Sequence, residues 1–390
     1  MRFTNTVKNT SRFIKTASVL TLALALAACG EQANNSATDE GTDGSATNTA
    51  ASSSGGAAFD TKVTINGAGA SFPAPLYQRW FAGLRKKNPN LQVNYQSVGS
   101  GAGVKQFVAE TVDFGASDVA MKDEEIGKVK KGALLLPMTA GSIVLAYNLP
   151  GVEGLKLSRE AYVDILLGKI TKWNDPKIAA ANEGANLPDK EITIVHRSDG
   201  SGTTGVFTKH LSAVSSEWKE KVGDGKTVSW PKGIGGKGNE GVTQLIKQTE
   251  GSIGYIEYGY AKQNGLTYAG LENKAGKFVV PTDESASKTL DAVTLPENLR
   301  AFIVDPEGDD SYPVVTYSWI LAYKTYDDPV KAKAMEVMIQ YGLNEGQEVS
   351  KELGYVPLPD SVKQKVAQAA DGISKDFQIA VNENTTTASK

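Results

Sequence analysis

The stretch Arg197-Ser198-Asp199-Gly200-Ser201-Gly202-Thr203-Thr204-Gly205 follows the apolar run Ile192-Thr193-Ile194-Val195 and precedes an amphipathic pattern over residues 204–214. The apolar run predicts a buried strand and the pattern predicts a helix, so the glycine-rich stretch is the turn between them. Such a turn leaves backbone N–H groups free at the positive end of a helix dipole, where anions bind favourably. Hydroxyl side chains and the planar guanidinium of Arg197 add donors. The stretch therefore predicts a site for a small oxyanion.

Two other segments place glycines and a hydroxyl ahead of an amphipathic pattern. Residues 67–75 read GAGASFPAP, and since prolines are tolerated in a first helical turn, a helix is expected to begin between Ser71 and Pro75. Residues 99–103 read GSGAG, and Ser100 stands where an N-cap is expected. An ordinary capped helix explains each segment alone, but three in one chain exceed what the composition predicts.

Length and composition bound the class of protein. At 390 residues the chain is expected to form two domains, and its 40% hydrophobic and 22% charged residues are typical of a soluble globular protein. The formal net charge is −3; without the four basic residues in 1–28, 37 basic residues stand against 44 acidic ones, a net charge of −7. An acidic surface argues against nucleic acid as a partner, so any anion must be held by local donors.

The N-terminal segment has the pattern of an export signal. A basic, acid-free start precedes the apolar run 17–28, which is too short to span a bilayer, so residues 1–28 are expected to be a signal peptide. The run ends Leu26-Ala27-Ala28-Cys29-Gly30, which resembles the bacterial lipobox and implies lipidation of Cys29, the only cysteine. Residues 29–58 are expected to be the lipidated cysteine and a flexible tether, and residues 382–390 a disordered tail.

The folded part alternates short apolar runs with helical patterns, which predicts an α/β fold with mainly parallel strands. The expected strands cover residues 62–65, 91–95, 143–148, 192–196 and 314–323. The expected helices cover residues 76–87, 104–110, 159–167, 204–214, 240–248 and 329–343. Residues 230–241 and 269–282 are expected to be loops.

Enzymatic chemistry is disfavoured by what surrounds the glycine-rich stretch. Its glycines match a dinucleotide fingerprint, but no strand with a terminal acid follows about 20 residues on. The chain has two histidines and no Cys/His cluster, which argues against zinc. A nucleophile at Ser201 would need His196 as its base, and strand alternation points His196 away from the side of Arg197. We therefore expect a protein without catalytic residues, metal or cofactor.

Six runs together resemble one known family, the substrate-binding proteins of bacterial high-affinity phosphate ABC transporters (Pst-type), here in a lipoprotein form. The likeness covers residues 62–366. The runs are 67–75 GAGASFPAP, 112–118 VDFGASD, 168–175 GKITKWND, 197–203 RSDGSGT, 235–241 GGKGNEG and 251–255 GSIGY. Position 71 is Ser where the family often has Thr, which keeps the hydroxyl.

The resemblance implies the type II periplasmic-binding-protein fold, two α/β lobes joined by two hinge crossovers with the ligand in the cleft. The first lobe would be residues 59–142 plus 312–381, and the second residues 143–311. The partners implied are inorganic phosphate and the membrane permease subunits of a phosphate importer, with an exported, lipid-anchored and monomeric protein. The family's phosphate contacts fall on Ser71, Phe72, Ser100 and Asp118 in the first lobe and on Arg197, Ser201, Gly202 and Thr203 in the second.

Two acidic residues take distinct roles in this interpretation. Asp118 would repel an anion unless the ligand brings a proton, which phosphate does near neutral pH and sulfate does not, so Asp118 is expected to select phosphate. Asp199 resembles the family acid that holds the arginine in place. From the residues alone, a helix or turn cap is the alternative for Asp118 and an Asx-turn for Asp199.

Other functions stay open at this point. Sulfate, molybdate or arsenate is an alternative ligand, and arsenate is protonated much as phosphate is. A phosphatase using Ser201 is a weaker alternative, and a surface adhesin or scaffold that keeps the fold is a third.

Overall fold

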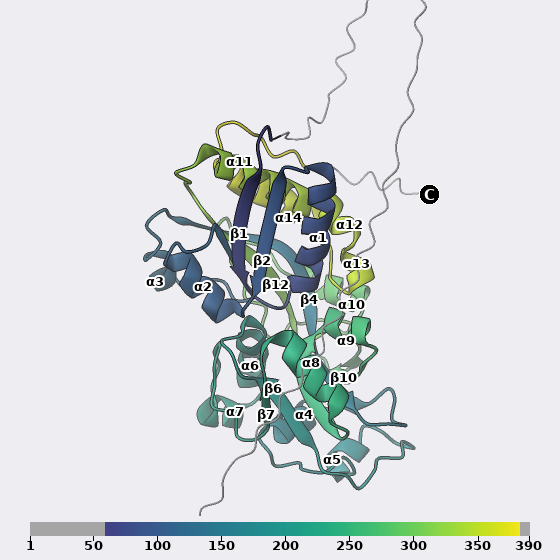
Figure 1. Ribbon diagram of the computed structural model, residues 1–390. Coiled ribbons are helices and arrows are strands. Elements are labelled where there is room, and N and C mark those ends of the chain that lie inside the picture. Colours follow the sequence, from purple (N-terminus) through teal and green to yellow (C-terminus); the bar gives the residue numbers. More distant parts are fainter. Residues whose placement is uncertain (1–58, 383–390) are drawn as a thin grey trace, which may run out of the picture. The chain divides into compact units, whose positions relative to one another are not determined.

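A nine-stranded sheet organises the protein; the computed structural model describes residues 59–382. The expected signal peptide, Cys29, the tether and residues 383–390 lie outside the described residues. Asn382, the first residue of the expected tail, donates its N–H to Asn344 Oδ1 at 2.8 Å. Along the sheet the strand order is β2-β1-β3-β12-β4-β8-β6-β7, with β9 paired to β4 (Figure 1).

The strands of the described part follow the chain in this order: β1 Val63–Gly69, β2 Leu91–Ser97, β3 Phe114–Ser117, β4 Ala133–Asn148, β5 Lys156–Leu157, β6 Thr193–Arg197, β7 Ile234–Gly236, β8 Ser252–Glu257, β9 Thr267–Tyr268, β10 Gly270–Glu272, β11 Phe278–Val279 and β12 Val315–Tyr323. The helices are α1 Ala74–Lys87, α2 Ser100–Val108, α3 Asp123–Ile126, α4 Arg159–Leu166, α5 Pro176–Ala179, α6 Gly202–Val214, α7 Ser216–Lys221, α8 Gly238–Gln248, α9 Tyr258–Asn264, α10 Asp283–Asp291, α11 Pro329–Leu343, α12 Glu345–Glu348, α13 Ser350–Leu353 and α14 Asp360–Ala370.

Strand direction changes in the middle of the sheet. β1 is parallel to β2 and β3, and β6 is parallel to β7 and β8. The central strands β12 and β4 instead make antiparallel pairs with β3, with each other and with β8. The expectation of mainly parallel strands is therefore right for each half and wrong for the centre, where the chain crosses between the halves.

The long strand β4 belongs to both halves of the molecule. Its first part pairs with β12 as far as Ser142, and from Ile143 it pairs with β8. We call the half that holds β1, β2, β3 and β12 the first lobe and the half that holds β6, β7 and β8 the second lobe. The pairing changes at the position where the lobe boundary is expected; the residue bounds of the two lobes stay a prediction.

The first lobe is held together by the apolar face of α1. Leu76, Tyr77, Trp80, Phe81 and Leu84 are buried and recur at the spacing of one helix face. Together they pack on the sheet, where β1 turns Val63 and Ile65 inward and Thr64 and Asn66 outward. At the end of β1, Gly103 of α2 approaches so closely that a Cβ there would lie 2.4 Å from the Cα of Gly69. Only glycine allows α2 to begin at this edge.

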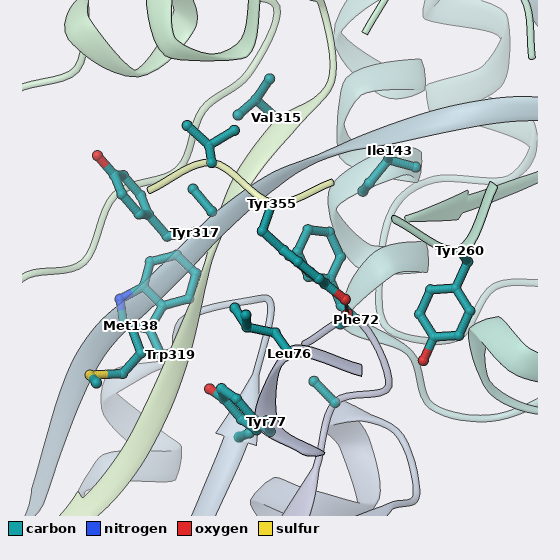
Figure 2. Packing of buried hydrophobic residues seen from close by; sticks show 14 of the residues in the cluster. Phe72, Leu76, Tyr77, Met138, Ile143, Tyr260, Val315, Tyr317, Trp319 and Tyr355 are labelled. Atoms are coloured by element: carbon teal, nitrogen blue, oxygen red, sulfur yellow. Dashed lines mark hydrogen bonds between the residues drawn. The ribbon is translucent and has the colours of Figure 1, made fainter. Parts of the chain in front are cut away.

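Aromatic side chains from distant parts of the chain pack where the lobes join. Figure 2 shows Phe72, Tyr260 and Tyr355 near Ile143 of β4. The ring of Phe72 makes an edge-on contact with Tyr355, with 6.2 Å between centroids. Tyr355 lies between α13 and α14, while Tyr260 comes from α9 of the second lobe. This packing ties the turn after β1 to both lobes.

Two expectations about local structure are corrected. The predicted loop 230–241 contains strand β7 and the start of α8, and the loop 269–282 contains β10 and β11. Ser100 is the first residue of α2 instead of its N-cap, which is Gly99. Short strands such as these depend on a neighbouring strand for their hydrogen bonds, which local pattern does not reveal.

Candidate functional site

The three predicted helix starts lie together in the structure. Gly202 opens α6 in the second lobe, and a Cβ built on it would lie 2.4 Å from Ser100 Oγ and 2.7 Å from Asp118 Oδ2 of the first lobe. The backbone N–H of Gly101 donates to Gly200 O at 2.8 Å. The lobes therefore meet in close contact at these turns.

Ser71 and Phe72 form the turn between β1 and α1. Tyr260 donates its hydroxyl to Ser71 O at 2.7 Å, and Tyr355 donates to Phe72 O at 2.7 Å. The ring of Phe72 is fully buried in the apolar core. Phe72 can therefore meet a ligand only through its backbone, whereas the hydroxyl of Ser71 faces the second lobe.

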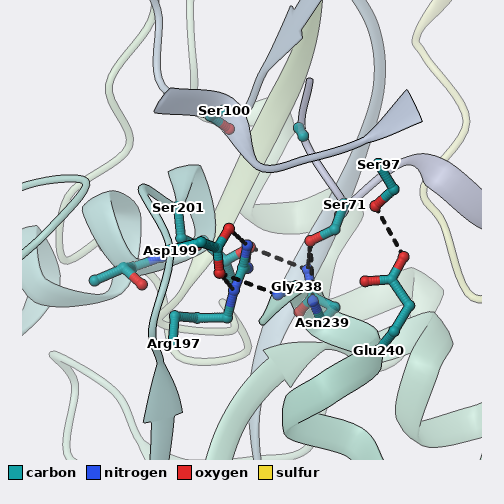
Figure 3. A network of polar contacts seen from close by, with 12 residues as sticks. Ser71, Ser97, Ser100, Arg197, Asp199, Ser201, Gly238, Asn239 and Glu240 are labelled. Carbon is teal, nitrogen blue, oxygen red and sulfur yellow. Dashed lines mark hydrogen bonds and ion pairs between the residues drawn. The ribbon is translucent and has the colours of Figure 1, made fainter. Parts of the chain in front are cut away.

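Arg197 and Asp199 form a buried ion pair at the end of β6. The guanidinium donates from Nε and Nη2 to the two carboxylate oxygens, at 2.8 and 2.6 Å, and its side chain is 1% exposed. Gly238 N–H donates to Asp199 Oδ1 at 3.0 Å (Figure 3). Burial acts to raise the pKa of Asp199, but the hydrogen bonds and charge of Arg197 outweigh it and lower that pKa. Asp199 is thus an anion that orients the arginine.

The first turn of α6 supplies hydroxyls and free N–H groups. Ser201 caps the helix, because its Oγ accepts from Thr204 N–H at 3.0 Å. The N–H groups of the first two helical residues, Gly202 and Thr203, have no partner within the helix, as at any helix start. Thr204 pairs its hydroxyl with Tyr255 at 2.6 Å, so it is committed to the core of the second lobe.

Asp118 lies across the cleft from this turn and is 1% exposed. Its Oδ1 accepts from Ser318 Oγ at 2.9 Å, and its Oδ2 faces Ser100 Oγ at 3.4 Å. Burial raises the pKa of Asp118 to about 7, and the hydroxyl of Ser318 and the charge of Arg197 only partly oppose it. The carboxyl therefore changes its protonation state near neutral pH.

Two residues of this cluster are absent from the sequence-based site. Asn239, fully buried at the start of α8, bonds to Ser71 and to Thr203, and Ser318 of β12 holds Asp118. Asn239 lies in the run GGKGNEG, where a glycine-rich segment ahead of a helix was a usable signal. No local sequence pattern points to Ser318, because its contact with Asp118 joins residues 200 positions apart.

His196, the base that a nucleophile at Ser201 would need, contacts other residues in the structure. His196 stacks on Trp230, with 5.1 Å between ring centroids, and its Nδ1 lies 3.1 Å from Arg197 O.

A cavity of about 490 Å³, lined by Asp118, Gly205 and Phe302 among others, adjoins the cluster. Among residues 59–382 no group of three or more His, Cys, Asp or Glu side chains could hold a metal ion. Within the same residues, no helix has both the length and the hydropathy of a membrane span.

Comparison with known sequences finds close relatives. The family model described as a PBP superfamily domain matches residues 33–342. A phosphate-binding protein PstS of Pasteurella multocida is 50% identical over 307 residues, which are 78% of this chain and 88% of that protein. A phosphate-binding protein PstS of Methanocaldococcus jannaschii is 38% identical over 325 residues, covering 77% of this chain and 84% of that protein.

Solved structures share the architecture at lower identity. A high-affinity periplasmic phosphate-binding protein, PfluDING, determined with bound phosphate, superposes with a TM-score of 0.64 at 19% identity, covering 80% of this chain and 99% of that one. A phosphate-binding protein from Stenotrophomonas maltophilia gives a TM-score of 0.63 at 18% identity, covering 78% of this chain and 93% of that one. At such identities the likeness establishes the fold, the two-lobed periplasmic-binding-protein fold.

Proposed function

The chain belongs to the PstS family of phosphate-binding proteins, and from that premise we propose that it binds inorganic phosphate between its lobes and delivers it to an ABC-type importer. The observation that carries the proposal is the position of Gly202, pressed against Ser100 and Asp118 of the other lobe and five residues from a buried arginine. The proposal assigns no chemical step to the chain.

In this proposal the donors come from both lobes. The first lobe contributes the hydroxyls of Ser71 and Ser100 and the backbone of Phe72. The second contributes Arg197, Ser201, Gly202 and Thr203 from the turn that opens α6. The helix dipole and free N–H groups favour negative charge there, and the remaining Nη hydrogens of Arg197 suit paired oxygens. Because Asp199 already neutralises Arg197, most of the anion's stabilisation comes from dipoles and hydroxyls.

Asp118 gives the proposed site its selectivity. A buried carboxylate next to an anion is tolerated only if one proton lies between them, and hydrogen phosphate supplies that proton. Sulfate has none, so once the carboxyl of Asp118 is ionised, a sulfate oxygen would face it without a hydrogen bond. Ser318 and Ser100 hold the carboxyl in place. Arsenate carries a similar proton and is not excluded by this argument.

Closure of the lobes completes the proposed site. Ser100 and Asp118 meet Gly202, and Ser71 meets Asn239, only when the lobes are in contact, as they are here. Strands β4 and β12 are the crossings at which the lobes can hinge. We propose the lobe bounds 59–142 with 312–381, and 143–311, on this basis.

The same proposal places the protein outside the cytoplasmic membrane. The signal pattern of residues 1–28 and the lipobox ending at Cys29 support export and lipid anchoring, and the acid-rich tether would let the folded part move off the membrane. The partners would be the permease subunits of the importer, met by a monomeric binding protein.

Calorimetric titration of residues 59–390 with phosphate and with sulfate tests the function. At about pH 9, where the carboxyl of Asp118 is ionised, we expect tight one-to-one binding of phosphate and at least about 100-fold weaker binding of sulfate. No phosphate binding at millimolar ligand would overturn the proposal. Release of product from a chromogenic phosphate ester would instead favour the phosphatase alternative.

A further inference from the structure

Asn239 is a fully buried side chain that hydrogen-bonds proposed phosphate contacts of both lobes. Its backbone N–H donates to Ser71 Oγ at 3.0 Å, and its Nδ2 donates to the same oxygen at 2.9 Å. The Nδ2 also donates to Thr203 Oγ1 at 3.2 Å. Figure 3 shows Asn239 beside Ser71, with Ser100 above them in the view.

The orientation of the Asn239 amide follows from its fourth hydrogen bond. Oδ1 accepts the backbone N–H of Glu257 at 2.9 Å. A backbone N–H can only donate, so the oxygen must face Glu257 and the NH₂ group must face the two hydroxyls. Both Nδ2 hydrogens are then used, one on each hydroxyl, and no other orientation satisfies all four bonds.

This arrangement decides what the two hydroxyls can do. A hydroxyl oxygen accepts two hydrogen bonds and donates one. Ser71 Oγ receives both of its bonds from Asn239, and Thr203 Oγ1 receives one from Asn239 and one from Arg197 Nη1 at 3.4 Å. With both acceptor positions filled, each hydroxyl has only its proton left to offer.

We infer that Asn239 is a positioning residue that makes Ser71 and Thr203 obligatory donors. It thereby sets the polarity of the site, by which we mean that the two hydroxyls present protons, not lone pairs, to an anion. The inference rests on the proposed function, in which those two hydroxyls contact phosphate. Without Asn239 each hydroxyl could turn its proton elsewhere and present a lone pair to the ligand, which repels an oxyanion. Since Asn239 and Ser71 belong to different lobes, Ser71 is oriented only on closure, whereas Thr203 lies in the same lobe as Asn239.

The primary test is Asn239→Asp, which keeps the shape and removes both Nδ2 donors. The new carboxyl oxygen would accept the protons of Ser71 and Thr203 and turn them away from the ligand, so phosphate affinity should fall by at least about 100-fold. The matched control is Asn273→Asp. Asn273 is also fully buried, with its Nδ2 bonded to the carbonyls of Gly308, Asp309 and Ser311. It should lower the melting temperature without changing phosphate affinity.

A second set of variants distinguishes a positioning role of Asn239 from a general structural role. These variants also test the inference if Asn239→Asp does not fold. Asn239→Ala should weaken phosphate binding about tenfold in the wild-type background. In a Ser71→Ala/Thr203→Val background, which lacks both hydroxyls, the same change should alter affinity by less than about twofold, because nothing is left to orient. Equal losses in the two backgrounds would overturn the inference.

The outcomes also distinguish this inference from the proposed function. If the wild type does not bind phosphate, the function fails. If the wild type binds phosphate and both Asn239 variants stay within about twofold of it, only the positioning role of Asn239 fails.

Discussion

The guanidinium of Arg197 and the carboxylate of Asp199 meet side-on, through Nε to Oδ1 at 2.8 Å and Nη2 to Oδ2 at 2.6 Å. The two residues are separated by one position, at the end of a strand that leads into a helix. This pairing occupies one edge of the guanidinium and leaves Nη1 on the side of Thr203, at 3.4 Å. Asp199 therefore determines which edge of the arginine is available to a ligand.

Replacing Arg197 by Lys should weaken phosphate binding by at least about tenfold, because an ammonium cannot bond Asp199 and the ligand with the geometry of the planar fork. Asp199→Asn should cost less, since the amide keeps one oxygen for Nε while the positive charge stays. Isothermal titration of the wild type and the two variants with phosphate gives the order of their affinities. If Asp199→Asn were the more damaging change, the ion pair and not the arginine would be the main determinant of binding.

Gly202→Ala should block closure of the lobes. The added Cβ would lie 2.4 Å from Ser100 Oγ and 2.8 Å from Asp118 Cβ, so the lobes could not reach the distance at which both hold the ligand. We expect at least tenfold weaker phosphate binding and no ligand-dependent decrease in the radius of gyration by small-angle scattering. Gly372→Ala, where a Cβ meets nothing within 4 Å, is the control and should behave as wild type in both measurements.

Asp118→Asn should lower the ratio of phosphate to sulfate affinity. The variant keeps the size and one acceptor, and its NH₂ group can donate to an unprotonated oxygen. Phosphate should bind with little change, because losing the charge repulsion offsets losing a strong hydrogen bond, while sulfate should gain affinity. Both ligands are titrated against wild type and variant at one pH. An unchanged ratio would leave Asp118 as a turn cap and remove its role in selection.

Sulfate binding by the wild type should depend on pH because of the pKa of Asp118, which burial raises to about 7. Below about pH 7 the carboxyl holds its proton and can donate it to a sulfate oxygen; above that pH it is an anion and repels sulfate. Sulfate affinity should therefore be level at low pH and fall toward tenfold per unit above about pH 7.

Competition of sulfate against phosphate between about pH 5 and pH 9, at constant ionic strength, measures this profile. Phosphate brings its own proton and should show the flatter profile, and Asp118→Asn should remove the dependence of sulfate binding on pH. A sulfate profile that is flat in the wild type would show that the proton on Asp118 does not govern the choice of anion.

Cys29→Ser in the full chain should release the folded part from membranes, because it removes the proposed acylation site. Phosphate affinity should be unchanged, since the proposed tether of about 30 residues separates Cys29 from the folded part. Membrane fractionation measures the release of the folded part, and titration of the released protein with phosphate measures its affinity. Membrane association that persists after signal cleavage in the variant would contradict the lipid anchor.

The strand-turn-helix start at Arg197 to Gly205 was predictable from local sequence alone. The apolar run, the glycines and the amphipathic pattern act over a few positions, and the structure has β6 and α6 where these signals lie. The cap that Ser201 forms on α6 was not predicted. The same holds for α1 as for β6 and α6, since its buried face was predictable from the spacing of its apolar residues. For Asp118, local pattern favoured a turn cap, and only resemblance to a family pointed to the cleft.

Tertiary structure alone decided which groups meet. Asn239 reaches Ser71 across 168 positions, and Ser318 reaches Asp118 across 200, through contacts that exist only once the two lobes close and β12 joins the sheet. Burial, which raises the pKa of Asp118 to about 7, is likewise a property of the assembled cleft. The amino-acid sequence by itself determined the local turns and their donors, since those interactions span few residues. The proposed polarity and selectivity of the site depend on the fold, because desolvation and hydrogen-bond saturation depend on neighbours brought from far along the chain.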